Sequence, residues 1–157
     1  MFNKNPDEFF MKEALRQAHK AGKQDEVPIG AVIVYKNEII ARAGNQVEML
    51  KDATAHAEMI AITQASSFLG NKWLSGCSLY VTIEPCSMCA GALVLSRIKE
   101  IIYGADDTKT GACGSVFNIA GSKELNHSIS IRKGVLVDDC GLLLSEFFKK
   151  KRAQGKK

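Results

Sequence analysis

The sequence lacks any long hydrophobic run. Its longest apolar stretches, such as Cys89 to Leu95, are much shorter than the roughly 20 residues that a membrane-spanning helix requires. The opening residues, MFNKNPDEFF, also lack the basic start, the apolar stretch and the small-residue cleavage site of a secretory signal. We therefore expect a cytoplasmic protein that does not cross a membrane.

The sequence also lacks the even set of cysteines that a disulfide framework needs. It has five cysteines, and in a reducing cytoplasm these are expected to be thiols or metal ligands. At 157 residues, with 46% apolar and 24% charged side chains, the composition is typical of one globular domain. A domain of this length buries roughly 70% of the surface that its unfolded chain exposes, so it needs no metal merely to stay folded. Any metal site would therefore suggest chemistry.

Acidic residues are absent from the last nine positions. This basic segment, residues 149–157, carries six of the 21 basic side chains, and the rest of the chain has a net charge of −2. Such a distribution is typical of a protein that binds a polyanion at one end, and the alternative is a solvated tail that only aids solubility. Phe147 and Phe148 precede the segment and favour nucleic acid, because aromatic rings stack on bases while cations hold phosphates.

Short β-rich runs predict five strands. The expected strands are 29–35, 38–44, 79–83, 101–103 and a fifth over about 129–137. Lys36-Asn37 separates the first two strands and indicates a hairpin. Four glycines between 104 and 126 indicate an irregular surface loop with a helical turn inside it, a kind of segment that often carries specificity.

Apolar residues at helical spacing predict four helices. The expected helices run from about Asp7 to Gly22, from an N-cap at Thr54 to about Phe68, from Pro85 to about Arg97, and from an N-cap at Asp138 or Asp139 to the basic segment. Strands that alternate with helices in the second half indicate right-handed crossovers and parallel pairing. We therefore predict a single α/β domain over residues 1–157, a three-layer α/β/α sandwich with a five-stranded mixed sheet and a basic C-terminal helix and tail (149–157).

Two short segments concentrate groups that can bind a metal. The first is Thr54-Ala55-His56-Ala57-Glu58, and the second is Glu84-Pro85-Cys86-Ser87-Met88-Cys89. Zn²⁺ prefers imidazole and thiolate ligands, and a Cys-x-x-Cys on the first turn of a helix points both sulfurs toward the positive end of the helix dipole. Three protein ligands, His56, Cys86 and Cys89, would leave one zinc position for water, which is typical of catalytic rather than structural sites.

Glu58 is the candidate that would move protons, because water on zinc reaches a pKa of roughly 7 and general acid–base work then needs a carboxyl group nearby. Residues two apart on a helix do not share a face, so an irregular helix start must bring His56 and Glu58 together. By chance, a His-x-Glu arises in this composition with a probability of about 0.2, and a Pro-Cys-x-x-Cys with about 0.002. The alternatives are a solvated helix charge for Glu58, and a redox dithiol or two buried thiols for the cysteine pair.

The remaining histidines and cysteines are expected to be ordinary surface, loop or core residues. They are His19, His127, Cys77, Cys113 and Cys140.

The two segments resemble the signature of the zinc-dependent nucleoside and nucleobase deaminases. Other stretches are similar to the bacterial tRNA-specific adenosine deaminases over nearly the whole chain: 27–32, 45, 54–58, 84–92, 104–114 and 145–148. The resemblance implies a cytidine deaminase-like fold, one Zn²⁺ per subunit, and a homodimer with active sites near the subunit interface. It also implies hydrolytic conversion of the wobble adenosine of a tRNA anticodon to inosine. Ala53 stands where this family often has Pro, which removes some rigidity but leaves the ligands unchanged.

The resemblance also implies a role for each candidate residue. His56, Cys86 and Cys89 would hold zinc, and Glu58 would transfer protons. For substrate binding, it implies that Asn45 hydrogen-bonds the flipped base, that Val27 lines its pocket and that Asp107 contacts the nucleotide. Phe147, Phe148 and Lys149 are expected to bind the anticodon stem-loop, because aromatic and cationic side chains cluster there.

Three other functions stay open at this point. A deaminase of free guanine or cytosine would need the zinc centre but not the basic, aromatic end, whereas His56 in place of Cys argues against a free cytidine deaminase. A non-catalytic RNA-binding module would use zinc structurally and would not need Glu58. A dithiol redox protein would hold no metal at Cys86 and Cys89.

Overall fold

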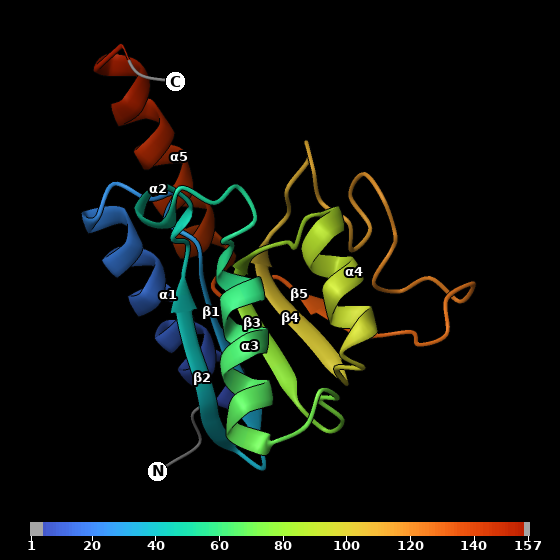
Figure 1. The fold of residues 1–157 in the computed structure, drawn as a ribbon. Helices are drawn as coiled ribbons and strands as arrows, with labels where there is room; N and C mark the ends of the chain where they lie inside the picture. The colour runs from blue at the N-terminus through green and yellow to red at the C-terminus, as the bar shows by residue number, and fades with distance from the viewer. Residues whose placement is uncertain (1–4, 156–157) are drawn as a thin grey trace.

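The computed structural model describes residues 5–155, so the expectations for Lys156 and Lys157 lie outside the described residues. Helices and strands follow one another in a mixed order (Figure 1). The helices are α1 (Pro6–Lys23), α2 (Val47–Leu50), α3 (Ala57–Leu69), α4 (Ser87–Leu95) and α5 (Val137–Ala153). The strands are β1 (Gly30–Tyr35), β2 (Glu38–Gly44), β3 (Ser78–Ile83), β4 (Glu100–Ala105) and β5 (Ser130–Lys133).

The strands form one five-stranded sheet in the order β2-β1-β3-β4-β5 (Figure 1). β1 pairs antiparallel with both β2 and β3, whereas β3, β4 and β5 are parallel. The mixed sheet and its parallel second half are therefore confirmed. The predicted hairpin is also confirmed, and its turn residues Lys36 and Asn37 have φ values of 50° and 64°, as a two-residue hairpin turn of the right twist requires.

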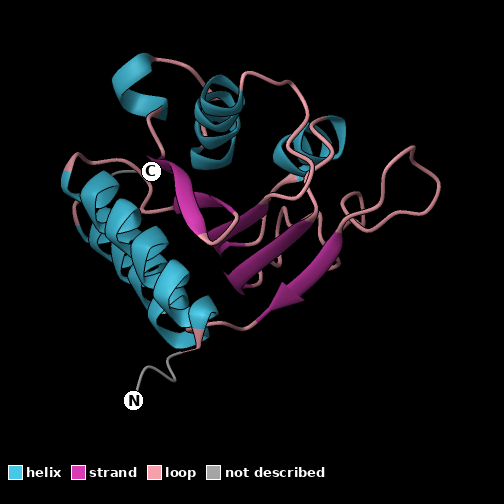
Figure 2. Ribbon diagram, turned by 90° about the horizontal axis from the view of Figure 1, so that it is seen from below, coloured by secondary structure: helices cyan, strands magenta, loops and turns pink. Residues whose placement is uncertain are grey.

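Helices cover both faces of the sheet, which confirms the three-layer sandwich (Figure 2). On one face, α1 and α5 pack on a cluster that includes Met11, Val32 and Ile102. On the other face, α3 and α4 pack on a cluster that includes Ile33 and Ala61. Val32 and Ile33 are neighbours in β1 and belong to different clusters, because successive strand residues point to opposite faces. None of the helices within residues 5–155 combines the length and apolar character that a membrane span needs.

The predicted start of α3 is wrong by two residues. Thr54 does not cap the helix, because its N–H and its hydroxyl both donate to Oδ1 of Asp52, at 2.8 and 2.7 Å. The N-cap is His56 instead. The structure also contains the single-turn helix α2, which the hydrophobic pattern did not predict.

The predicted start of α4 is wrong as well. Pro85 precedes the helix, and its carbonyl accepts a hydrogen bond from the N–H of Ala112 at 2.9 Å, so Cys86 becomes the N-cap. The segment between β4 and β5 is an irregular loop, as predicted. Its helical turn is the one in which the N–H of Gly111 donates to the carbonyl of Asp107 at 2.9 Å.

The C-terminal boundaries also differ from the prediction. β5 is shorter than predicted, because the chain turns at Gly134, which has a φ of 89°. Leu136 is the N-cap of α5, and Asp138 and Asp139 lie in its first turn, where their charges interact favourably with the helix dipole. α5 continues to Ala153, so most of the described part of the basic segment is helical.

Candidate functional site

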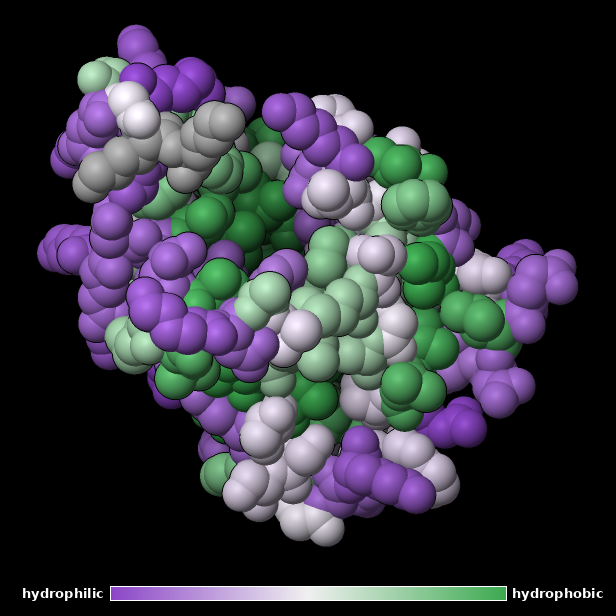
Figure 3. All heavy atoms as spheres, turned by 45° about the horizontal axis from the view of Figure 1, so that its top comes forward, coloured by the Kyte–Doolittle hydropathy of each residue, from purple (hydrophilic) through white to green (hydrophobic). Residues whose placement is uncertain are grey.

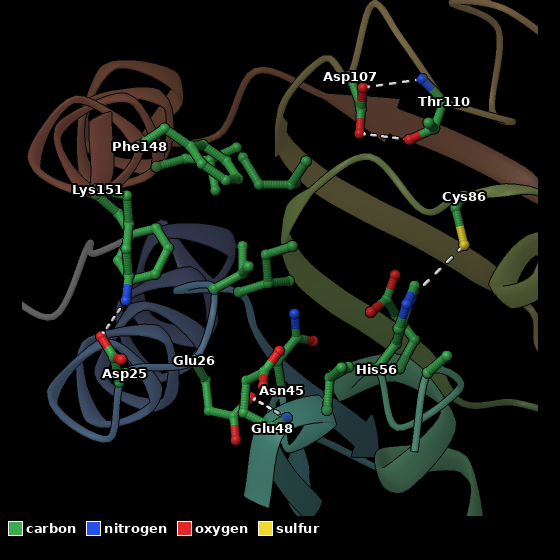
Figure 4. Close-up of a pocket in the computed structure, with 18 of the residues that line it drawn as sticks. Asp25, Glu26, Asn45, Glu48, His56, Cys86, Asp107, Thr110, Phe148 and Lys151 are labelled. Carbon is green, nitrogen blue, oxygen red and sulfur yellow. Dashed lines mark hydrogen bonds and ion pairs between the residues drawn. The ribbon is translucent and has the colours of Figure 1, made fainter. Parts of the chain in front are cut away.

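The three predicted metal ligands meet where two helices begin. His56 is the N-cap of α3, Cys86 is the N-cap of α4, and Cys89 lies in the first turn of α4. Nδ1 of His56 lies 3.6 Å from Sγ of Cys86 and 3.5 Å from Sγ of Cys89. The three ligand atoms all lie within 4.8 Å of one another. The structure therefore brings together three side chains that come from segments thirty residues apart, and Figure 4 shows two of them, His56 and Cys86.

The electrostatics of this triad favour a cation. Hydrogen bonds from Cys89 and His56 lower the pKa of Cys86 to about 4, and the positive ends of the two helix dipoles also favour a thiolate. The same contact with Cys86 raises the pKa of Cys89 and that of His56. A divalent metal would replace the protons that these three side chains share in their hydrogen bonds. One imidazole nitrogen and two sulfurs form a donor set of catalytic zinc sites, so these residues fit Zn²⁺.

Glu58 lies beside the triad and is buried. The residue is 4% exposed, and it lines the same cavity as His56 and Cys86. His56 has an extended backbone, with φ −75° and ψ 152°, so the regular helix begins only after it. This irregular start allows the His56 and Glu58 side chains to lie close together. Burial raises the pKa of the Glu58 carboxyl to about 7. This burial contradicts the alternative of a solvated helix charge.

In metal-free protein, we expect Glu58→Gln to stabilise the fold strongly at pH 8 and by only about 1 kcal/mol at pH 5. The folded pKa of about 7 exceeds the usual unfolded value of about 4.3, so stability is greatest below that lower value and falls as the pH rises toward and through 7. A neutral amide avoids burying a charge, and the gain at pH 8 should reach about 3 kcal/mol. Urea unfolding of EDTA-treated proteins at both pH values measures this. Equal differences at pH 5 and pH 8 would contradict a raised pKa.

A cavity of about 920 Å³ extends from the triad to α5. Figure 3 shows a hollow with hydrophobic side chains inside it and hydrophilic ones around it. The cavity is lined by five of the six residues predicted to contact substrate: Val27, Asn45, Asp107, Phe147 and Phe148. The sixth, Lys149, is exposed and does not line the cavity, whereas Lys151 does.

Asn45 joins the strand layer to the metal-ligand helix. It follows β2 and is 6% exposed. Its Oδ1 accepts a hydrogen bond from the N–H of Ala57 at 2.8 Å, which satisfies a backbone donor in the first turn of α3. The amide group points into the cavity (Figure 4). Since its oxygen is already bonded, the NH₂ is the part that Asn45 can offer to a ligand.

Asp107 stabilises its own turn at the cavity wall. Its carboxylate accepts from the N–H groups of Lys109 and Thr110, at 2.9 and 3.0 Å, and from the hydroxyl of Thr110 at 2.7 Å (Figure 4). Burial acts to raise the pKa of Asp107, but these hydrogen bonds outweigh it and the pKa is lowered. Asp107 and Thr110 therefore form an ordered, charged part of the wall.

The end of α5 closes the opposite side of the cavity. Nζ of Lys151 lies 2.5 Å from Oδ1 of Asp25, in the turn after α1, and 5.4 Å from the centroid of the Phe147 ring. The rings of Phe147 and Phe148 pack edge to face, with centroids 5.5 Å apart. The side chain of Lys151 is only 15% exposed, so this lysine is part of the wall rather than of a solvated tail (Figure 4).

Two buried carboxyl groups in the cavity lining had no predicted role. Glu26, which is 1% exposed, accepts from the N–H groups of Glu48 and Met49 at 2.9 and 2.8 Å and so holds α2 in place. Glu84 is 3% exposed and contacts the loop that follows β4. A buried charge needs partners, but the partners of Glu26 and Glu84 lie more than twenty residues away, and no local pattern signals them.

The other histidines and cysteines are placed as expected. Cys77, Cys113 and Cys140 are buried free thiols, and His19 is exposed. His127 bonds the carbonyl of Ile98 through Nε2 at 2.6 Å.

Comparisons with known proteins agree with this geometry. The family described as MafB19-like deaminase matches residues 5–152. The tRNA-specific adenosine deaminase of Bacillus subtilis (strain 168) is 48% identical over 150 residues, which cover 96% of this chain and 93% of that protein. The tRNA-specific adenosine deaminase of Aquifex aeolicus (strain VF5) is 54% identical over 145 residues, covering 92% and 95%. A structure from studies of A-to-I editing by tRNA:A34 deaminases has a TM-score of 0.84 and 43% identity, and the match covers 87% of this chain and 99% of that one.

Proposed function

Because the chain belongs to the tRNA-specific adenosine deaminases, we propose that its cavity binds the wobble adenosine of a tRNA anticodon and that Glu58 transfers the protons of the reaction. The chain is a hydrolase that deaminates adenosine to inosine in tRNA, on a cytidine deaminase-like fold. The observation that carries the assignment of this site is the buried Glu58 carboxyl beside one imidazole and two thiols at one end of the cavity.

We propose that His56, Cys86 and Cys89 hold one Zn²⁺ per chain. Their spacing and their shared protons support this assignment. When bound, the ion supplies Lewis acidity, which makes water nucleophilic at neutral pH.

Glu58 has the position and the pKa of a general acid–base group. The water oxygen forms a bond to C6 of adenine, the C6–N6 bond breaks, and ammonia leaves inosine behind. Glu58 would accept one proton from the attacking water and pass it to N1. It would then accept the second proton, from the new hydroxyl on C6, and pass it to the departing amine. A pKa of about 7 suits both acceptance and release of a proton near neutral pH.

Asn45 and Val27 would hold the base over this group. The Asn45 NH₂ can donate to a ring nitrogen of the purine, because the Asn45 oxygen is bonded to Ala57. Val27 would contact the flat face of the base, since it lines the cavity beside Ile29.

The far end of the cavity would bind the rest of the anticodon loop. Its bases are already unstacked, so flipping an adenosine there costs less than in a duplex. Phe147 and Phe148 offer rings for a neighbouring base, and Lys151 brings positive charge to this wall. Lys149 is exposed outside the cavity and would contact phosphates farther along the RNA.

Phe148→Ala is expected to raise KM on an anticodon stem-loop about tenfold, because a base stacked on an aromatic ring contributes about 1–3 kcal/mol. Phe148 is 41% exposed at the cavity wall. The measurement is steady-state inosine formation. Phe9→Ala is the matched control, because Phe9 is 55% exposed on α1 and does not line the cavity. An equal response of the two variants would remove Phe148 from the binding surface.

The proposed function is tested by offering the protein an anticodon stem-loop with a wobble adenosine beside free adenine, guanine, cytosine and adenosine. We expect inosine in the RNA and no ammonia from the free compounds. Ammonia from guanine or cytosine, with no inosine in the RNA, would favour the free-nucleobase deaminase instead.

We also propose that two copies of the chain associate through the exposed side of α4 and the loop beside it. Leu95, Val116 and Phe117 are 80%, 45% and 53% exposed, and such apolar surface is typical of an interface. Light scattering should give twice the 17.1 kDa mass of one chain, and a mass of one chain would contradict the homodimer. Since the substrate is tRNA, we propose that the protein is cytoplasmic.

A further inference from the structure

Glu84 is a buried carboxylate that the proton transfers do not use. It directly follows β3, it lies two residues before Cys86, and it lines the cavity. Four donors bond its two oxygens, and all four come from residues 107–115. A single carboxylate therefore binds both ends of a nine-residue loop segment that faces the substrate cavity.

Each of the two Glu84 oxygens accepts two hydrogen bonds from this segment. Oε1 accepts from the N–H of Asp107 at 3.0 Å and from the hydroxyl of Ser115 at 2.5 Å. Oε2 accepts from the N–H of Cys113 at 2.9 Å and from the N–H of Ser115 at 3.1 Å. Hydrogen bonds to a charged group are stronger than those between neutral groups. Glu84 thus fixes the beginning of the segment through one oxygen and its end chiefly through the other.

The backbone next to Glu84 binds the same segment. The carbonyl of Pro85 accepts from the N–H of Ala112, and Cys86 forms a β-bridge with Gly111. Gly111 allows this close approach, because a Cβ there would overlap the Glu84 carboxyl group. The metal-ligand segment and the 107–115 segment are therefore packed as one unit.

The effect of this unit reaches the cavity through Asp107. Glu84 holds the backbone of Asp107, and the Asp107 carboxylate in turn holds the backbone and hydroxyl of Thr110. Both Asp107 and Thr110 line the cavity. Loss of the hydrogen bond between Glu84 and the Asp107 N–H would make Asp107 more mobile, and with it the Thr110 that Asp107 holds.

We propose that Glu84 is a positioning residue, which holds residues 107–115 against the metal-ligand segment and thereby sets the part of the cavity wall that contacts the RNA. This inference rests on the proposed function, because it assigns the wall to substrate binding.

Glu84→Gln is a selective test, because glutamine has the same shape but one acceptor oxygen and an NH₂ donor. If the NH₂ replaced Oε2, it would face the N–H groups of Cys113 and Ser115. If it replaced Oε1, only the N–H of Asp107 would lose its acceptor, since the Ser115 hydroxyl can turn and accept. The amide therefore adopts the second orientation, which releases Asp107 and keeps the end of the segment bound.

We expect Glu84→Gln to raise KM for the anticodon stem-loop about tenfold, with kcat lowered less than about threefold and zinc still at one per chain. Ser115→Ala is the matched control, because it removes one of the four donors and leaves no backbone N–H unpaired. It should change KM less than about twofold. A merely structural role would lower the active fraction, and so kcat, with KM unchanged, and that result would overturn the proposal.

Two further measurements separate the possible outcomes. In an Asp107→Ala background, Glu84→Gln should change KM by less than about twofold, since neighbouring residues in one network are not additive. A full tenfold effect there would overturn the inference. Hydrogen exchange should show faster exchange at the Asp107 amide in Glu84→Gln, and unchanged exchange would overturn it too. A wild-type chain that makes no inosine would contradict the proposed function itself, whereas an active wild type with an unchanged variant KM would contradict only the role of Glu84.

Discussion

Replacement of Glu58 by Ala should lower kcat for inosine formation by about 10²- to 10⁴-fold, which is the usual contribution of a general acid–base group. The zinc content and the Kd for the RNA should change little, because Glu58 is not one of the three proposed ligands and the RNA surface lies farther along the cavity. Single-turnover kinetics with saturating enzyme measures this step separately from binding.

Glu38→Ala is the control for Glu58→Ala. Glu38 is an exposed glutamate at the start of β2 and does not line the cavity, so its removal should leave kcat unchanged. An unchanged kcat of Glu58→Ala would contradict its role in proton transfer. No inosine from the wild type, with RNA bound equally by both proteins, would favour the alternative of a non-catalytic RNA-binding module in which the metal is structural.

Cys86→Ala should abolish both zinc binding and activity. Removing one of three protein ligands leaves two, and the remaining thiol and imidazole do not make a tight site. Protein purified without added zinc should contain one Zn²⁺ per wild-type chain and less than about a tenth of that in the variant. Atomic absorption or a chromogenic chelator gives the stoichiometry.

Cys77→Ala is the matched control for metal loss. Cys77 is also a free cysteine, and it is fully buried in the core beside Leu79. Its replacement should retain zinc and activity, with a modest loss of stability. A metal-free wild type in which Cys86 and Cys89 oxidise to a disulfide would instead support the redox alternative.

The regular part of the fold follows from local patterns. The five strands and the order of the main helices are read from hydrophobic periodicity, since each face of the sheet needs its own set of apolar residues. The helix starts were misplaced where a residue that is a good local cap has another partner. Thr54 bonds Asp52, and Pro85 bonds Ala112. The first of these bonds lies within one turn, and the second joins segments that are far apart in the sequence. Helix propensity includes neither bond.

The sequence predicts the metal ligands of the candidate site, but not all of the residues that form the cavity wall. The ligand set follows from residue type and spacing, and the structure brings its three atoms together. Glu84 and Glu26 could be assigned no role, because their partners lie 22 to 31 residues away along the chain. The sequence does not single out Lys151, because the predicted last helix ends where the basic segment begins. Once α5 is known to reach Ala153, Lys151 lies one turn beyond Phe147 on the same face, whereas Lys149 does not.

The use of helix starts for the metal ligands has a consequence for stability. The N-cap positions of α3 and α4 are the places where Ser, Thr, Asp or Asn would each contribute about 1 kcal/mol. His56 and Cys86 occupy them and make no capping hydrogen bond with their side chains. For α3, Asn45 supplies an oxygen to the first turn from a distant strand end, so the residue proposed to hold the base also replaces the missing cap. Metal binding and helix N-capping thus compete for the same two positions.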